Sequence, residues 1–225
     1  PLLSNIMLNE LDKELTRRGH RFVRYADDMV ILLKSKRAAN RVMESVIRFI
    51  ECRLYLKVNR DKTEVVPFTR IKFLGYSFYQ TKNEVRFRIH TKSIAKMKAR
   101  VKELTCRSSG KGNNTRKKSL SYFIKGWVNY FRYADMQKIL QRIDGWYRRR
   151  LRMVIWRQWK RVRTRFKFLH RLGIDKDKAW QFANTRKSYW RTAKSPILSR
   201  SITTARLNQA GYLFFYDHYK SLKCD

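Results

Sequence analysis

The pattern of apolar residues changes near residue 90, and this change limits the folds open to the chain. Before it, short segments rich in β-branched and aromatic residues alternate with helical segments; after it, apolar residues recur at helical spacing over long stretches. Residues 1–90 carry 19 Lys and Arg against 10 Asp and Glu, whereas residues 91–225 carry 35 against 7. The sequence therefore predicts an α+β fold, with a mixed first part and a basic helical second part.

The expected elements follow this division. In the first part we expect helices at residues 5–18 and 36–54, a hairpin at 22–33 with acidic residues at its turn, and short strands at 64–68 and 71–79. In the second part we expect long helices at 91–106, 116–133 and 136–160, a Gly- and Ser-rich loop at 108–114, and shorter helices beyond, with a break at Pro196.

The formal net charge of +37 excludes most ordinary soluble enzymes. A compact chain with this charge repels itself, which favours a polyanionic partner. Hydrophobic residues at 43% and aromatic residues at 14% exclude a disordered tail. No apolar run is long enough for a membrane span, no signal-peptide pattern occurs, and three scattered cysteines favour a reducing compartment. We expect no membrane partner, and the oligomeric state stays open.

The adjacent carboxylates of Asp27 and Asp28 are the first candidate site. They repel each other at the turn of a hairpin, and Mg²⁺ relieves such repulsion because it binds one or two carboxylates together with water and substrate phosphate. Two such ions activate a 3′-hydroxyl and stabilise the leaving oxygen in nucleotidyl transfer. For an isolated Asp pair, an ordinary β-turn is the favoured explanation. The surrounding motifs favour the metal site.

Those motifs occur in a recognisable order. Residues 22–28 (FVRYADD), 56–63 (LKVNRDKT) and 73–76 (FLGY) resemble the palm of reverse transcriptases, and residues 1–15 resemble the helix before its acidic hairpin. Residues 122–131, 146–152 and 156–160 resemble the maturase region of group II intron-encoded proteins, and Trp180, residues 188–191 and residues 195–196 continue the likeness to bacterial members. The resemblance covers nearly the whole chain, so it implies a bacterial group II intron reverse transcriptase/maturase.

The resemblance implies roles for individual residues. Asp27 would be the main Mg²⁺ ligand and Asp28 the second carboxylate. Lys62 would protonate the pyrophosphate leaving group, although a surface lysine is the alternative. The expected primer or substrate contacts are Tyr25, Ala26, Phe73, Leu74 and Gly75. Phe73 and Leu74 are alternatively a buried strand.

The family's third metal-binding Asp and its nucleotide-binding fingers precede the acidic hairpin, whereas this sequence opens at Pro1. We therefore expect a C-terminal portion of such a protein, with little or no polymerase activity by itself. The four histidines are scattered and no CxxC occurs, which resembles the subgroup without an endonuclease domain. A cytoplasmic, nucleoid-associated location in a bacterium is implied.

The basic helical part is the second candidate site. Residues 146–171 hold eleven Lys and Arg, no acid and six aromatic residues. The stripe formed by Ile139, Ile143, Trp146 or Tyr147, Leu151, Val154 or Ile155, and Trp159 has the period of a core-facing surface. Basic residues cover the other faces, and their single sign favours phosphate contact. The expected RNA contacts are Arg148, Arg149, Arg152, Arg157, Lys160, Arg161, Arg163, Arg165 and Lys167.

By resemblance, residues 1–90 would be a partial reverse-transcriptase palm, 91–150 a thumb and maturase domain, and 151–225 a basic nucleic-acid-binding region. The implied function is an RNA-directed DNA polymerase that also binds structured intron RNA to assist splicing and retrohoming, with an RNA template and a DNA primer or target as partners. The alternative is a non-catalytic RNA-binding splicing factor whose palm is only a scaffold. A general basic protein, such as a ribosomal protein, does not account for the ordered palm motifs.

Overall fold

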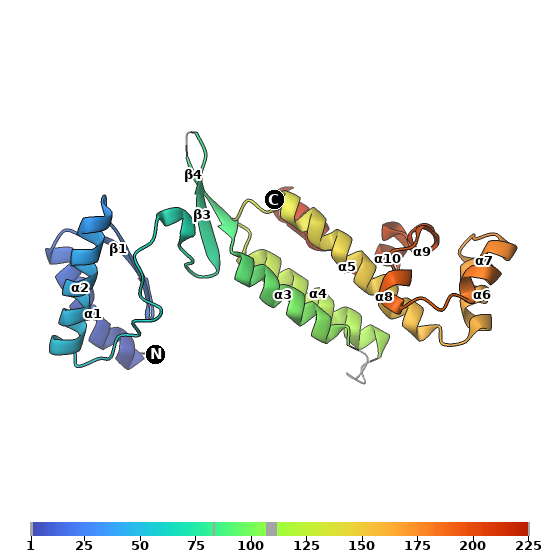
Figure 1. Cartoon of the computed structure of the whole chain (residues 1–225), viewed down its shortest axis with the longest axis horizontal. Helices are drawn as coiled ribbons and strands as arrows, with labels where there is room; N and C mark the ends of the chain where they lie inside the picture. Colours follow the sequence, from blue (N-terminus) through green and yellow to red (C-terminus); the bar gives the residue numbers. More distant parts are fainter. Residues whose placement is uncertain (1, 83, 107–111, 225) are drawn as a thin grey trace. The chain divides into compact units, whose positions relative to one another are not determined.

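A computed structural model describes residues 2–82, 84–106 and 112–224 of the chain (Figure 1). The chain divides into two compact units, Pro1–Arg86 and Phe87–Asp225, called here the first and second units. Strands occur in the first part and helices dominate the second, so the predicted α+β class is confirmed. Residues 107–111 of the predicted loop lie outside the described residues.

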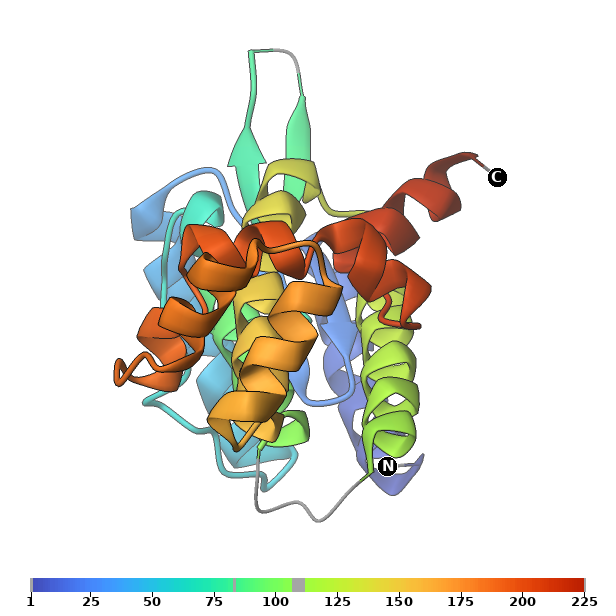
Figure 2. The same ribbon diagram turned by 90° about the vertical axis from the view of Figure 1, so that its right-hand side faces the viewer.

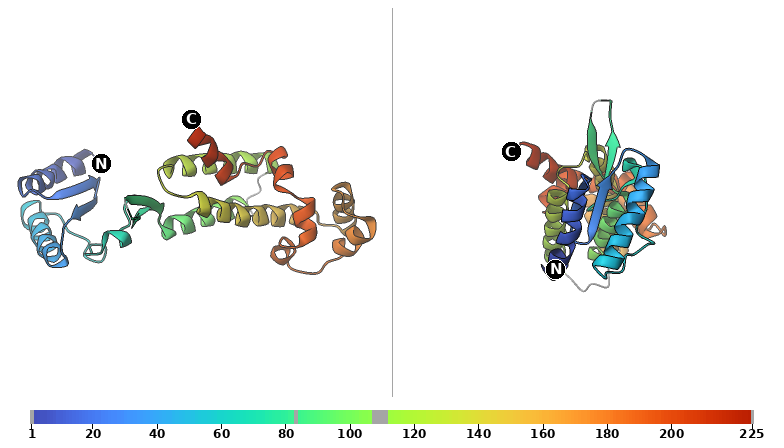
Figure 3. Two further views of the ribbon diagram at one scale, coloured as in Figure 1. Left: turned by 90° about the horizontal axis from the view of Figure 1, so that it is seen from above. Right: turned by 90° about the vertical axis from the view of Figure 1, so that its left-hand side faces the viewer.

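The first unit is built around a hairpin between two helices. Its elements are α1 (Leu2–Arg17), β1 (Arg21–Tyr25), β2 (Asp28–Leu32) and α2 (Lys36–Arg53). The strands pair antiparallel, with Phe22 opposite Ile31. Figure 3 shows α1 and α2 beside the hairpin, and Leu11, Leu15 and Val46 form the buried core between them. The predicted helices and hairpin are thus confirmed.

The rest of the first unit departs from expectation. The predicted strand at 64–68 is wrong: this segment is irregular and leads into a short 3₁₀ helix, η1 (Phe68–Arg70), because Pro67 offers no N–H to a strand ladder. The predicted strand at 71–79 begins only at Tyr76. There β3 (Tyr76–Gln80) pairs with an unexpected strand, β4 (Val85–Ile89), as a second two-stranded sheet (Figure 2).

The second unit is helical. Its helices are α3 (Thr91–Leu104), α4 (Asn113–Tyr130), α5 (Gln137–Gln158), α6 (Val162–Arg171), α7 (Lys176–Ala183), α8 (Tyr189–Thr192), α9 (Pro196–Ser201), α10 (Thr204–Gln209) and α11 (Phe215–Cys224). Pro196 starts a helix rather than only interrupting one: it is the first residue of α9, and the Ser195 hydroxyl caps that helix by accepting from the Leu198 N–H at 3.3 Å.

The core of the second unit lies between its longest helices. One face of α4 is buried through Leu120, Ile124 and Val128, and α11 packs against both α4 and α5 (Figure 3). The apolar stripe predicted on α5 is confirmed at Ile143, Tyr147, Leu151, Val154 and Trp159, while Leu140 is buried and Ile139 only half-buried. Among the described residues, no helix is long and apolar enough to cross a membrane.

Candidate functional site

The acidic turn has an unusual backbone. Tyr25 pairs with Asp28, so only Ala26 and Asp27 form the loop between β1 and β2. Ala26 has φ 54°, in the left-handed region that a residue with a Cβ rarely adopts. Both carboxylates are exposed, and neither is hydrogen-bonded or ion-paired to another described residue. The turn therefore presents one carboxylate on a strained two-residue loop and a second at the first residue of β2.

Arg24 holds this turn in place. Its guanidinium donates to both carboxylate oxygens of Asp12 on α1, at 2.8 and 2.5 Å, and also to the Ala26 carbonyl at 2.9 Å. The Asp12 carboxylate raises the pKa of Arg24 above its usual range. Helix α1 thus positions the acidic turn through one side chain. Sequence reasoning missed this pair, although the alternation of β1 places Arg24 on the helix-facing side with Phe22.

The other face of the hairpin is open. Tyr25 is 64% exposed, and Val23 and Leu32 on the same face are also exposed. Because side chains alternate along a strand, Tyr25 and Asp28 stand together on this face, away from the core formed with α1 and α2. A ligand approaching this face meets the Tyr25 ring beside a carboxylate.

The remaining palm candidates lie on two other turns. Lys62 is exposed in a turn whose backbone closes through its own N–H to the Asn59 carbonyl at 3.2 Å. Leu74 and Gly75, with φ 51° and 82°, form a two-residue turn closed by two hydrogen bonds between Phe73 and Tyr76. Gly75 suits this geometry, whereas Leu74 is strained there. No hydrogen bond joins Lys62 to the acidic turn within the part of the chain that the structure describes.

The donor set of the acidic turn fits Mg²⁺ in part. Mg²⁺ keeps several waters and takes one or two carboxylates together with substrate phosphates, which Asp27 and Asp28 match. Across residues 2–82, 84–106 and 112–224, however, no group of three or more His, Cys, Asp or Glu residues lies together. The described residues thus offer two carboxylates to such an ion, and water and substrate would have to supply its other ligands.

The basic residues of α5 and α6 fall into two groups. Three of the predicted RNA contacts serve the fold. Arg149 donates to the Trp190 carbonyl at 2.9 Å and lies 4.0 Å from its ring centroid, and Arg152 donates to the Ile202 carbonyl at 3.0 Å. Arg165 donates to the Trp159 carbonyl at 2.9 Å. Burial lowers the pKa of Arg152.

The second group consists of two half-buried arginines and four exposed residues. Arg148 and Arg157 are half-buried, the latter 5.5 Å from the Tyr189 ring centroid. The four exposed residues Lys160, Arg161, Arg163 and Lys167 surround the junction of α5 and α6, and we call them the basic corner. None of the four carries an ion pair with another described residue. The basic corner is thus the part of the predicted set most open to phosphate.

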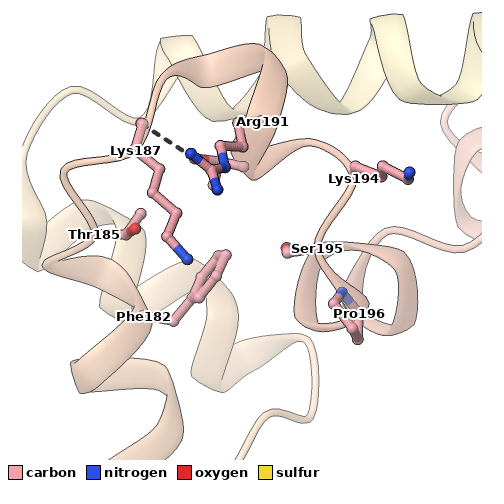
Figure 4. A pocket seen from close by; sticks show the side chains of 8 residues that line it. Phe182, Thr185, Lys187, Arg191, Lys194, Ser195 and Pro196 are labelled. Carbon is pink, nitrogen blue, oxygen red and sulfur yellow. Dashed lines mark hydrogen bonds between the residues drawn. The ribbon is translucent and has the colours of Figure 1, made fainter.

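A further basic feature was not predicted. A pocket of about 280 Å³ lies where α7, α8 and α9 meet (Figure 4). Its lining includes Lys187, Arg191 and Lys194 and no acidic residue. The segment is held by the Thr192 hydroxyl, which donates to the Lys187 carbonyl at 3.2 Å. The absence of any Asp or Glu from residue 178 to residue 216 is the sequence signal that points to this region.

Asp144 is the one acid of α5, and it is buried. Its carboxylate accepts the backbone N–H groups of Phe215 and Tyr216, at 3.0 and 2.9 Å, and so caps the start of α11. Burial raises the pKa of Asp144 to about 6, against the lowering effect of these two hydrogen bonds. Sequence reasoning missed this cap, and the signal that could have found it is a single acid within an Arg-rich helix. Its role here is to join α11 to α5.

Comparison with known proteins found matches in both parts of the chain. The family model of the reverse transcriptases (RNA-dependent DNA polymerases) matches residues 1–78, and that of the group II intron maturase-specific domain matches residues 94–173. Protein P of duck hepatitis B virus (strain China) is 32% identical over 81 residues, or 36% of this chain and 10% of that protein. Protein P of strain Germany/DHBV-3 is 32% identical over 77 residues, or 34% and 10%. The chain thus spans about a tenth of the length of these curated relatives. A reverse transcriptase segment that carries the acidic turn, followed on one chain by a maturase-specific segment, makes this protein a member of the group II intron-encoded reverse transcriptase/maturases.

Proposed function

We propose that the chain forms part of an RNA-directed DNA polymerase that also binds its intron RNA and assists splicing and retrohoming. One observation carries the proposal. The two free carboxylates lie on a positioned hairpin turn within the reverse transcriptase match, and an acid-free run of exposed cations lies within the maturase match. RNA template, DNA primer or target and intron RNA are the partners. The protein is located in the cytoplasm of a bacterium, near the nucleoid.

In the palm, Asp27 is the main Mg²⁺ ligand and Asp28 the second. Bound metal would activate the primer 3′-hydroxyl and stabilise the leaving oxygen. The side chains of this chain do the positioning: Arg24 fixes the turn through the Ala26 carbonyl, and Tyr25 packs against the primer end on the open face of the hairpin. Lys62 serves as the proton donor to pyrophosphate, and the turn at 73–75 holds the primer strand.

In the helical part, the basic corner contacts intron RNA phosphates. Structured RNA is recognised largely by shape, phosphates and 2′-hydroxyls, which suits cations without neighbouring acids. Binding of a structured intron RNA, measured by fluorescence anisotropy, should weaken with salt on a log–log scale by about 0.7 to 0.9 per phosphate contact. An affinity that does not change with salt would contradict this role.

Metal binding by the acidic turn can be tested in the chain itself. Mn²⁺, used as a paramagnetic stand-in for Mg²⁺, should broaden the backbone NMR signals of residues 25–29, and Asp27→Asn should remove the effect. Glu84→Gln, which changes an exposed carboxylate on the β3–β4 connection, is the matched control and should leave the broadening unchanged. Equal broadening in the Asp27→Asn variant would contradict the assignment.

The chain by itself is proposed to synthesise little or no DNA. Two carboxylates without a third protein ligand bind metal weakly, and the described residues bring no third acid to the turn. Primer extension with Mg²⁺ measures this directly. Robust synthesis that depends on Asp27 would contradict the proposed deficiency.

The second candidate function is an RNA-binding splicing factor without polymerase chemistry. The described residues bring no third acid to the acidic turn, and this favours it. The test uses a version extended with the reverse transcriptase strand that supplies the family's third carboxylate. Synthesis that is lost in Asp27→Asn while RNA binding persists supports the polymerase. No synthesis in either version supports the splicing factor.

A further inference from the structure

Gly126 occupies a position where nothing in the described part of the chain requires a glycine. It lies in the interior of α4, where only proline is less favourable. It is exposed, and a Cβ added there would meet no atom within 4 Å. Its backbone is not in the left-handed region either, unlike that of Gly19, Gly75, Gly173 and Gly211. Neither packing within the chain nor backbone conformation explains this residue.

The neighbours of Gly126 on the helix surface are large and aromatic. Tyr122 and Tyr130 lie one turn before and one turn after it, 76% and 53% exposed. At a rise of 1.5 Å per residue, the two tyrosines are about 12 Å apart along the helix. Because the same residue spacing puts all three on one face, two rings flank a stretch of bare backbone. We call Tyr122, Gly126 and Tyr130 the tyrosine notch.

The charged residues of α4 indicate which class of molecule the notch binds. Helix α4 contains no Asp or Glu, and the exposed Lys118 and Lys125 lie on the same face as Tyr122. The buried residues of α4 are Leu120, Ile124 and Val128, and they lie on the opposite face of the helix. The notch therefore points away from the core. A helix face of aromatic rings and cations, with no acid on the helix itself, complements nucleic acid.

We propose that the tyrosine notch binds an unpaired segment of RNA. One nucleotide lies against the bare backbone at Gly126, and flanking bases stack on the rings of Tyr122 and Tyr130. The ammonium groups of Lys118 and Lys125 face the phosphates, and the tyrosine hydroxyls are donors to 2′-hydroxyls. The inference rests on the proposed RNA binding and adds the form of the RNA and its place on α4.

The test uses the whole chain, a labelled oligo(U) probe and anisotropy at fixed salt. Gly126→Ala should raise the melting temperature, because alanine favours the helix. It should nevertheless weaken binding by about five-fold, because the added methyl group fills space that the nucleotide occupies against the backbone. Gly126→Leu should weaken it further. Tyr122→Ala should weaken binding by about ten-fold and Tyr122→Phe much less, since the ring is kept. None of these changes alters charge, so the salt dependence should stay the same.

Gly145→Ala is the matched control. Gly145 is also exposed within a helix, α5, and a Cβ there would meet only the flexible Arg148 guanidinium, at 3.8 Å. It should raise the melting temperature and leave oligo(U) binding unchanged. An equal loss in both glycine variants, or no loss in Gly126→Ala, would overturn the notch. If the notch variants weaken the binding of a duplex RNA as much as the binding of oligo(U), the proposal that the notch binds unpaired RNA is overturned.

The two proposals fail in different ways. If the unchanged chain binds no RNA in a salt-dependent manner, the proposed RNA function fails and the notch with it. If the unchanged chain binds RNA and the notch variants bind equally well, only the notch fails.

Discussion

The first unit exposes much of its apolar surface, whereas the second unit buries most of it. Among the described residues, the buried hydrophobic side chains of the first unit are Leu11, Leu15 and Val46. The second unit buries whole faces of α4 and α5 together with Phe214 and Phe215. Burial of apolar area is the main favourable term in folding, so the second unit should be the more stable.

The region with the higher net charge is also the one that we expect to be more stable. Residues 91–225 carry a net charge of +28, against +9 for residues 1–90, yet the more highly charged region has the larger core. The α5 arginines explain part of this, since Arg149 and Arg152 donate to backbone carbonyls of later segments. The proposed chemistry thus lies on the unit with the smaller core and the proposed RNA binding on the unit with the larger core. Low local stability is common in functional elements.

The largest expected effect is a difference in amide hydrogen exchange. Amides of β1 and β2 should exchange about a thousand-fold faster than those in the middle of α5, because a core of three residues stabilises the hairpin. Hydrogen exchange with mass spectrometry on the whole chain measures both regions together. Equal protection of β1 and α5 would break the comparison.

Next in size is the loss of RNA affinity when the basic corner is neutralised. Replacing Lys160, Arg161, Arg163 and Lys167 together by Gln should weaken structured RNA binding by about a hundred-fold near 0.1 M salt and flatten the salt slope by about 3. The matched control replaces the exposed Lys34, Lys36, Arg37 and Arg41 of the first unit by Gln, for the same charge change. Equal losses in both would mean that net charge alone binds the RNA.

Removal of the Asp144 cap should destabilise the second unit by about 2 kcal/mol. Asp144→Ala leaves the N–H groups of Phe215 and Tyr216 without their acceptor at the buried start of α11. Urea unfolding followed by circular dichroism measures the change. A loss below about 0.5 kcal/mol would mean that α11 is held by packing alone.

Arg24→Gln should destabilise the first unit by about 1.5 kcal/mol, through loss of its charged hydrogen bonds to Asp12. Exchange of the β1 and β2 amides should rise while that of α5 stays constant. The control Lys13→Gln removes an ion pair between two exposed side chains, Lys13 and Glu10, and should change stability by less than about 0.5 kcal/mol. Matching effects of the two variants would contradict the anchoring role of Arg24.

The smallest expected effect is a pH dependence confined to the second unit. Burial raises the pKa of Asp144 to about 6 from the usual 3.8, so the folded state binds more protons between these values. Stability should therefore fall as pH rises through this range, by about 1 kcal/mol between pH 5 and 6. Asp144→Asn cannot ionise and should flatten that part of the curve. A curve that is the same in both proteins would show that the carboxylate is not responsible.

Local patterns predicted the elements wherever period and end signals agreed. The helix ending before Gly19 and the hairpin around the Ala26–Asp27 turn are both found, because helical spacing and alternation act over a few residues. The strand predicted at 64–68 was wrong because Pro67 offers no N–H to a strand ladder and no described strand pairs with this segment. The strand β4 was not predicted, because it is a strand through its pairing with β3, and its own residues do not show that pairing.

The residue types of the candidate sites could be predicted from the sequence, whereas their contacts and exposure could be predicted less well. The acidic turn was predicted, and its two-residue loop is found. The predicted RNA contacts on α5 and α6 stay predictions, and the structure divides them between internal contacts, as at Arg149, and the exposed basic corner. The Asp12–Arg24 pair and the Asp144 cap were missed because each joins residues far apart in sequence.

The sequence by itself determined the α+β class, the acidic turn, the concentration of charge beyond residue 90 and the family. These depend on residue identity and on spacing within one element. Only the tertiary structure decided which arginines are internal donors, that a buried Asp144 starts α11, and that Gly126 lies bare between two exposed tyrosines. The physical reason is that burial, partner choice and open space arise from segments that meet only after folding.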